Sequence, residues 1–293
     1  MTRIGEEPPV AVVTDTTHYL PRGMAERLAV HQVSLYVHWS GRSERELQMD
    51  GFDAFYERMR TEPELPSTSQ PSIGDFLEVW EPLLAAGQDI VSVHVAGGIS
   101  GTCDTARQAR KMLEGRQLAD RVTVIDGETV CGGLGLLVLA ACSAAREGGT
   151  REAVAERVHE ARAALKIWFC LDTLDYVRRG GRIGKAQAWL GSTLKIKPIL
   201  SMESEVTPVE RVRTRRRAME RMVRYMHELR ERGADGWVVQ HIQARRQSEQ
   251  LVEQGREIFG CDPLFVSEVG PVIGTYGGPG MIGVAGIPRV LCR

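Results

Sequence analysis

The chain has 293 residues, which is long enough for two ordinary domains with a substantial core. Its 37 basic and 38 acidic side chains give a formal net charge of −1, so the composition excludes the strongly basic surface expected of a nucleic-acid-binding protein. The six cysteines include no C-x-x-C pair and no Cys/His spacing typical of zinc ligands. This pattern argues against a metal site or a disulfide framework and favours a reducing compartment.

No segment has the hydropathy of a signal peptide or of a membrane span. Residues 1–9 contain charges and two prolines but no apolar core. The most apolar stretch, residues 132–142, is about half the roughly 20 residues needed to cross a bilayer, and it is typical of a buried helix. We therefore expect the protein to be cytoplasmic.

The first half of the chain alternates apolar strands with amphipathic helices. Ser72 and Asp75 form a capping-box pattern that predicts a helix start. Two further helices are expected, one from about Thr102 and one over residues 134–145. The expected strands are residues 10–13, 90–95 and 122–125. Strands separated by helices imply right-handed βαβ crossovers, so we predict a three-layer α/β/α domain with a parallel sheet.

The pattern changes near Ile167, after a helix for which Thr150 is the expected N-cap. One long helix follows, with residues such as Met222 and Leu229 on its inward face. The expected strands of this half are residues 168–171, 196–201, 237–240, 264–267 and 272–275. We therefore predict an N-terminal domain over residues 9–166 and a C-terminal two-layer α/β domain with a mixed sheet over residues 167–290.

Four segments place small or hydroxyl residues where a strand should end. They are residues 14–17, 68–72, 97–102 and 274–280. Ligands of open α/β sheets bind outside the carboxyl ends of the strands, and loops that lead into helices offer free N–H groups to an anion. Each segment alone is better explained as a turn or an N-cap. Together they predict a neutral clamp for a carboxylate or a phosphate.

The order of these segments along the chain resembles the DegV family. The resemblance rests on Thr-Asp-Thr-Thr at 14–17 with Tyr-Leu-Pro at 19–21, Thr-Ser-Gln-Pro-Ser at 68–72, Ile-Ser-Gly-Thr at 99–102, Val-Ile-Asp at 124–126, Gly-Gly-Arg-Ile at 180–183, Leu-Lys-Ile-Lys-Pro-Ile-Leu at 194–200, Val-Arg-Thr at 212–214 and the closing glycine-rich loop. It covers roughly residues 10–287. It implies a bacterial, two-domain carrier of long-chain fatty acids that has no cofactor and no catalytic activity. Such a carrier presents the acid to a separate fatty-acid kinase, which makes the acyl phosphate.

The resemblance also implies a ligand site at the junction of the two domains. The hydroxyls of Thr68 and Ser100 should meet the carboxylate, N–H groups of residues 97–102 should add to the clamp, and Arg182 should lie near its mouth. The full expected set is Thr68, Ser69, Gly97, Ser100, Arg182, Thr275 and Tyr276.

Two departures from the family pattern fall at this headgroup site. Tyr276 stands where relatives usually have a histidine, and Ala96 and Gly97 stand where they commonly have serines. A tyrosine can donate a hydrogen bond but does not become cationic near neutral pH. A carrier for a different amphiphile is therefore an alternative.

A phosphate-handling enzyme that uses the same hydroxyl loops is a second alternative. Residues 180–186 approach a phosphate-binding loop, but the spacing is one residue short and no Ser or Thr follows Lys185. Cys103 at a helix start and His94 in a strand are each interpreted as buried structural residues. Asp15 and Asp126 suit turn and cap roles as well as a metal.

Residues 210–232 contain nine arginines against four glutamates. The plain interpretation is a solvated helix face. The alternative is that residues 211–224, from Arg211 to Arg224, form an electropositive patch that docks on the kinase or transiently on an anionic membrane surface.

Overall fold

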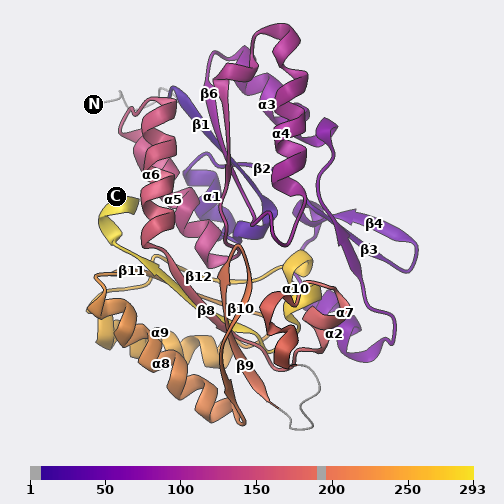
Figure 1. The fold of residues 1–293 in the computed structure, drawn as a ribbon, viewed down its shortest axis with the longest axis vertical. Coiled ribbons are helices and arrows are strands. Elements are labelled where there is room, and N and C mark those ends of the chain that lie inside the picture. Colours follow the sequence, from indigo (N-terminus) through magenta and orange to yellow (C-terminus); the bar gives the residue numbers. More distant parts are fainter. Residues whose placement is uncertain (1–7, 190–195) are drawn as a thin grey trace.

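The computed structural model describes residues 8–189 and 196–293. Leu194 and Lys195 of the motif at 194–200, and most of the N-terminal segment 1–9, lie outside the described residues. The chain forms two main β-sheets stacked end to end, each with its own helices (Figure 1). A small third sheet projects at one side.

The first sheet is entirely parallel and has the strand order β2-β1-β6-β7. Its strands are β1 (Val10–Asp15), β2 (His31–Val33), β6 (Asp89–His94) and β7 (Val122–Asp126). In Figure 1, α5 and α6 lie to the left of this sheet and α3 and α4 to its right. These helices are α3 (Ile73–Ala85), α4 (Thr102–Met112), α5 (Gly132–Arg146) and α6 (Arg151–Ala164), and the short α1 (Arg22–Arg27) lies on the α5 side. The predicted three-layer α/β/α arrangement is confirmed.

Side chains of β1 alternate between the two helical layers. Val10 and Val12 belong to the core that includes α5, whereas Ala11 and Val13 pack in the core under α3 and α4. A strand buried on both faces requires a continuous apolar run rather than alternation, which is what the sequence shows. The predicted capping box is present, because the Ser72 hydroxyl accepts the N–H of Asp75 and the Asp75 carboxylate accepts the N–H of Ser72.

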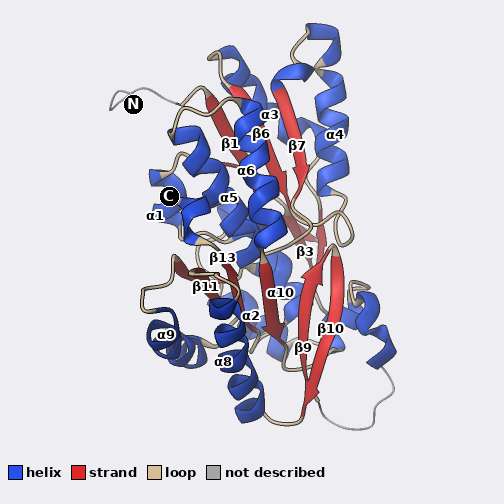
Figure 2. Cartoon of the chain, turned by 60° about the vertical axis from the view of Figure 1, so that its left-hand side comes forward, coloured by secondary structure: helices blue, strands red, loops and turns tan. Residues whose placement is uncertain are grey.

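The second sheet is mixed and has the order β10-β9-β8-β13-β11-β12. Its strands are β8 (Lys166–Cys170), β9 (Lys197–Glu203), β10 (Glu205–Val212), β11 (Gly236–His241), β12 (Phe265–Glu268) and β13 (Ile282–Ile287). Helices α8 (Arg215–Glu231) and α9 (Arg245–Phe259) cover one face (Figure 2). The predicted mixed sheet with helices on one face is therefore confirmed.

Helix α5 holds the two halves together. It contacts β1 and β6 of the first sheet and β8, β11 and β13 of the second. All of its residues from Gly132 to Ala145 are buried, which explains why this stretch is apolar all round. The halves share one continuous hydrophobic core, in which Leu136 and Leu137 of α5 join Val238 and Ala285 of the second sheet.

Residues 31–69 contain structure that the sequence did not predict. A three-stranded antiparallel sheet has the order β4-β3-β5, with β3 (Tyr36–Trp39), β4 (Arg42–Arg45) and β5 (Ser67–Ser69), and α2 (Asp53–Thr61) lies between β4 and β5 in the chain. Short 3-10 helices occupy Thr16–His18, Glu46–Gln48, Glu114–Arg116, Ala119–Arg121, Gly184–Trp189 and Arg289–Cys292.

The strand predicted at residues 272–275 was wrong. This segment is the helix α10 (Pro271–Gly277). Pro271 stands at the first helical position, where its fixed φ angle and missing N–H are compatible with a helix. The β-branched Val272 and Ile273 suggested a strand, but tertiary contacts at the helix start override that preference. A shorter helix, α7 (Asp175–Arg179), lies beside α10.

Of the helices within residues 8–189 and 196–293, none combines the length and the apolar character that a bilayer crossing requires.

Candidate functional site

An apolar cleft lies between the two halves and encloses about 700 Å³ of empty space, part of it open to solvent. The N-terminal half contributes apolar side chains from loops beside the parallel sheet, and the C-terminal half contributes them from the segment after β8, from α7 and α10, and from the β9–β10 hairpin. These residues are Leu35, Val95, Ile99 and Val130 from the first half and Leu171, Val177, Met202, Val206, Val272 and Ile273 from the second. The cleft can therefore bury an elongated apolar ligand in contact with both halves.

Polar side chains gather at one end of this cleft. Thr68 on β5 and Tyr276 on α10 are joined by a hydroxyl–hydroxyl hydrogen bond of 2.6 Å. The Ser100 hydroxyl lies 2.8 Å from the hydroxyl of Thr102, at the start of α4. Ser69 lies beside Thr68, and its hydroxyl is 2.8 Å from Nε2 of His38. Hydroxyl groups can both donate to and accept from a ligand, so this end suits a carboxylate.

Arg182 and Tyr276 cover this polar end together. The Arg182 guanidinium lies 5.1 Å from the centre of the Tyr276 ring, and its Nε donates to the carbonyl of Ile99. A Cβ atom at Gly180 would lie 2.2 Å from the same ring, so only glycine permits this packing. The Gly-Gly-Arg-Ile motif therefore shapes the cleft, and the element that follows it is the 3-10 helix Gly184–Trp189 rather than the α-helix that follows a phosphate loop.

Two of the expected site residues do not line the cleft. The N–H of Gly97 donates to the carboxylate of Asp126 at 3.1 Å, and it is therefore already used within the protein. The Thr275 hydroxyl donates to the carbonyl of Pro271 inside α10, and its side chain is buried. The residues that the structure brings together at the cleft are Thr68, Ser69, Ser100, Arg182 and Tyr276. Thr17 and Gln70 also line it; they lie in the singled-out segments 14–17 and 68–72 but were not in the expected set of site residues.

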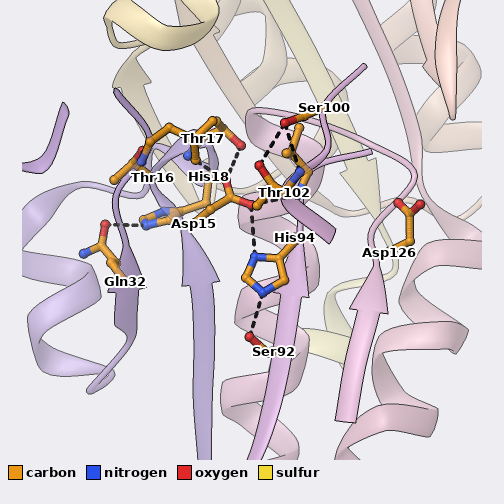
Figure 3. Close-up of polar contacts among 12 residues, drawn as sticks. Asp15, Thr16, Thr17, His18, Gln32, Ser92, His94, Ser100, Thr102 and Asp126 are labelled. Carbon is orange, nitrogen blue, oxygen red and sulfur yellow. Dashed lines mark hydrogen bonds and ion pairs between the residues drawn. The ribbon is translucent and has the colours of Figure 1, made fainter. Parts of the chain in front are cut away.

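A buried carboxylate organises the loops on the N-terminal side of the cleft (Figure 3). Asp15 ends β1 and accepts hydrogen bonds from the N–H and hydroxyl of Thr17 and from the N–H of Val95. Its other neighbour is His94, whose Nδ1 lies 3.2 Å away. Burial alone would raise the pKa of Asp15, but the hydrogen bond and charge of His94, with those further donors, hold the pKa below its usual value. Asp15 thus fixes the positions of Thr17 and Val95.

The chain Ser92–His94–Asp15 has the order of a catalytic triad. The Ser92 hydroxyl lies 2.7 Å from Nε2 of His94, which in turn contacts Asp15 (Figure 3). Ser92, however, is a strand residue with 0% exposure, and it does not line the cleft. A nucleophile must reach the reacting atom of its substrate, so this serine has no access to one. The predicted role of His94 as a satisfied core histidine is confirmed.

A sequence profile of the DegV family, described as an uncharacterised protein family, matches residues 9–289 of this chain. The chain belongs to the DegV family. It is 32% identical to the protein DegV of Bacillus subtilis over 279 residues, which cover 94% of this chain and 98% of that protein. A DegV domain-containing protein of Clostridium acetobutylicum is 34% identical over 278 residues, with 94% of this chain and 96% of the relative covered.

Solved structures of DegV proteins share this fold. The crystal structure of DegV, a fatty acid binding protein from Bacillus subtilis, matches with a TM-score of 0.85 and 32% identity, covering 96% of this chain and 99% of that one. A fatty-acid-binding DegV family protein from Thermus thermophilus matches with a TM-score of 0.85 and 31% identity, covering 95% and 99%. The predicted family and fold class are thus confirmed.

In this DegV chain, a second buried carboxylate supports α10 from behind. Oε1 of Glu46 accepts the N–H of Val272 and the hydroxyl of Tyr19, at 2.8 and 2.9 Å. Tyr19 in turn accepts the N–H of Ile273. Burial raises the pKa of Glu46 to about 7, although its hydrogen bonds oppose that rise. The first turn of α10, and with it the position of Tyr276, therefore depends on Glu46.

A second cavity of about 380 Å³ adjoins the cleft. It lies between the start of α5 and the inner face of the second sheet, and its lining includes Val238, Met281 and Ala285. Val130 and Ile273 line both spaces, so the two spaces meet at these side chains. The second cavity could not be predicted from the spacing of apolar residues in the sequence, because its lining residues come from many separate segments.

Cys103 and Asp126, which the sequence analysis considered as candidates for chemistry, have structural roles. Cys103 is fully buried, and burial raises the pKa of its thiol to about 12. Asp126 accepts the N–H groups of Gly97 and Glu128. Across the described ranges, no three His, Cys, Asp or Glu side chains are grouped closely enough to hold a metal ion.

The arginines of the expected basic patch differ in their surroundings. Arg215 donates to the carbonyl of Gly280 and pairs with Asp172, close to the end of α10. Arg221 pairs with Glu210. Arg216 and Arg217 both pair with Glu220 on the same helix, but their side chains are 84% and 64% exposed. Arg216, Arg217 and Arg224 line an open groove between α8 and α9, whose other lining includes Met219 and Val223.

Proposed function

We propose that this chain binds and carries a long-chain fatty acid without catalysing any change in it. The observation that carries the proposal is an apolar cleft that ends in the hydroxyl groups of Thr68, Ser100 and Tyr276. The fatty-acid-binding relatives from Bacillus subtilis and Thermus thermophilus, which share the fold over nearly the whole chain, support the same ligand class.

The acyl chain supplies most of the affinity in this proposal. Each buried CH₂ contributes roughly 0.8 kcal/mol, so a chain of about 15 methylenes contributes on the order of 12 kcal/mol before the cost of association. Hydrogen bonds from hydroxyls contribute about 1 kcal/mol each. They therefore orient the carboxylate more than they hold it.

The tail follows the apolar lining away from the polar end. It passes Val130 and Ile273, which line both spaces, and its far part occupies the second cavity. This path uses both halves of the chain and keeps the methyl end out of water.

We further propose that a separate fatty-acid kinase acts on the bound acid. Ser100 and Thr68 are partly exposed, and Arg182 is exposed, so a carboxylate held there would stay accessible to a partner. The groove that carries Arg216, Arg217 and Arg224 is a candidate docking surface for that kinase or for an anionic membrane. Such a carrier would work in the cytoplasm.

The docking part of the proposal is tested by reversing charge at Arg216 and Arg217 to Glu. Arg215 is left unchanged, because it holds the carbonyl of Gly280 and would disturb α10. The double variant should deliver acid to the kinase more slowly while binding the acid as the wild type does. Equal delivery rates would reject docking through this groove.

Native mass spectrometry of the purified protein tests the ligand class. A co-purified mass equal to that of a free fatty acid supports the proposal, whereas an empty protein that binds nucleotide contradicts it.

The hydroxyl clamp for the carboxylate is tested by combining Thr68→Val with Ser100→Ala. Loss of two hydrogen bonds should weaken fatty-acid binding by roughly 10- to 100-fold. Unchanged affinity and orientation would reject the clamp.

A further inference from the structure

The segment from Thr68 to Ser72 connects the small sheet to α3. At its start, β5 pairs with β3, so that Val37 lies opposite Thr68 and Tyr36 lies opposite Ser69. At its end, Ser72 is the N-cap of α3. Because the connection is short, the position of Thr68 depends on what holds these two ends.

The two oxygens of the Asp75 carboxylate have different partners. Oδ2 accepts the N–H and the hydroxyl of Ser72, at 2.8 and 2.7 Å, as part of the capping box. Oδ1 accepts the hydroxyl of Tyr36 at 2.8 Å and Nη2 of Arg45 at 2.6 Å. A capping box needs only the contacts with Ser72, so the helix start does not explain the contacts of Oδ1.

Tyr36 and Arg45 act as one unit on the β3–β4 hairpin. They lie opposite each other in the antiparallel pair, and Nε of Arg45 donates to the Tyr36 hydroxyl at 3.1 Å. In Figure 1 this hairpin projects at the right of the molecule, below α3 and α4. Through Asp75, these two side chains join the hairpin to the first turn of α3.

The Asp75 carboxylate is suited to hold both donors. Its side chain is 8% exposed. Burial would raise its pKa, but the hydrogen bonds of Ser72 and Tyr36 and the charge of Arg45 hold the pKa below its ordinary value. The group is therefore ionised at neutral pH, and hydrogen bonds to an ionised group are stronger than those between neutral groups.

The same contacts determine where Thr68 lies. β5 has three residues and forms one edge of its sheet, so its own pairing holds it weakly. The 2.6 Å bond between Thr68 and Tyr276 nevertheless requires that β5 lie at a fixed distance from α10. Tyr36 meets this requirement from both sides, because its backbone pairs with Ser69 and its hydroxyl bonds to Asp75.

We propose that Tyr36 and Arg45 are positioning residues for the ligand headgroup: by binding Asp75, they hold residues 68–72 so that the Thr68 hydroxyl reaches the polar end of the cleft. The cleft lining within residues 8–189 and 196–293 includes neither side chain, so both act through Asp75. The proposal rests on the proposed function, because it concerns the same headgroup site.

The test uses palmitic acid labelled with carbon-13 at its carboxyl carbon and at its terminal methyl carbon. Dissociation constants and carbon-13 spectra of the bound acid are measured for the full-length wild type, for Tyr36→Phe and for Arg45→Gln. Asp75 is left unchanged, because its replacement would also break the capping box of α3. Arg42→Gln is the matched control, since it removes the same charge from the same strand at an exposed residue outside this network.

Tyr36→Phe and Arg45→Gln should each weaken palmitic acid binding about 5-fold, the ratio expected when one hydrogen bond to the headgroup is lost. The carboxyl resonance of the bound acid should shift or broaden in both variants, while the methyl resonance stays as in the wild type. Arg42→Gln should match the wild type in affinity and in both resonances, because the segment 68–72 keeps its support.

Three outcomes overturn the inference. The first is wild-type affinity and an unchanged carboxyl resonance in Tyr36→Phe and Arg45→Gln. The second is a joint change of the carboxyl and methyl resonances, which would indicate a general loss of structure. The third is an equal effect of Arg42→Gln. Failure of the proposed function looks different, because the wild type itself would then show no resonance of bound palmitic acid.

Discussion

The carboxyl group of Glu46 offers the sharpest test of how α10 is held. Replacing it with Gln retains an oxygen that can accept the N–H of Val272 but removes the ionisable group. Glu46 is only 4% exposed, and burial raises its pKa from an ordinary value of 4.5 to about 7. Its ionisation is therefore coupled to folding.

The size of this coupling follows from the two pKa values. Below the ordinary value, Glu46 is protonated in both the folded and the unfolded chain. Between about 4.5 and 7, the unfolded chain releases the proton while the folded chain retains it, so rising pH favours unfolding. A difference of roughly 2.5 units corresponds to about 3 kcal/mol, all of which is lost once the pH exceeds the folded value.

Urea unfolding between about pH 5 and pH 8 measures this effect. The free energy of unfolding of the wild type should fall by about 3 kcal/mol relative to that of Glu46→Gln over this range. The difference between the two proteins is the quantity to compare. Burial lowers the pKa of His18 and of His241, and those groups make both proteins more stable as the pH rises.

Glu44→Gln is the matched control, because Glu44 lies two residues away with an exposed side chain. This variant should keep the pH dependence of the wild type. Parallel curves for Glu46→Gln and the wild type would refute the reasoning, because they would mean that Glu46 ionises as easily in the folded chain as in water.

Three further substitutions test the cleft. Gly98→Ala would place a Cβ atom 2.3 Å from the carbonyl oxygen of Ser204, so it should lower the free energy of unfolding by about 1–3 kcal/mol in urea titrations. Tyr276→Phe removes the 2.6 Å bond to Thr68 and should weaken fatty-acid binding about 5-fold in calorimetry, with the fold retained. Ile273→Trp fills space where the two cavities meet, so on the proposed tail path long-chain acids should lose affinity while medium-chain acids do not; equal losses would contradict that path.

The two main sheets could be predicted because the local sequence signals for strands and helix starts agree with the burial of those segments in the fold. β1 and β6 are apolar runs that are buried on both faces, and the helix starts at Ser72 and Thr150 carry side-chain caps. The small sheet of β3, β4 and β5 could not, because its strands are short and β4 is mostly exposed. α10 was mistaken for a strand because its start is held by distant groups, Glu46 and Tyr19, that no local pattern reveals.

The polar end of the site was accessible from sequence, but the apolar part was not. The resemblance to the family identified Thr68, Ser69 and Ser100. Thr68 and Ser69 lie within β5 of the small antiparallel sheet, so the rule that ligands bind beyond the ends of parallel strands would not have found them. Gly97 was placed in the clamp by the same resemblance, yet its N–H is taken by Asp126. Ile273, which lines both cavities, belongs to no recognisable sequence motif, and its position depends on how two distant segments pack.

The two departures from the family pattern have a joint consequence for pH. A Cβ atom at Gly97 would lie 2.6 Å from the Asp126 carboxylate, so a serine would not fit here without a shift of that carboxylate. Tyr276, where the family resemblance implies a histidine, bonds to Thr68 and does not become cationic near neutral pH. Glu46, whose pKa burial raises to about 7, accepts the N–H of Val272 and therefore lies one contact behind α10 and the proposed headgroup site. Any pH dependence of ligand binding near neutrality should accordingly change in Glu46→Gln and should survive in Tyr276→Phe.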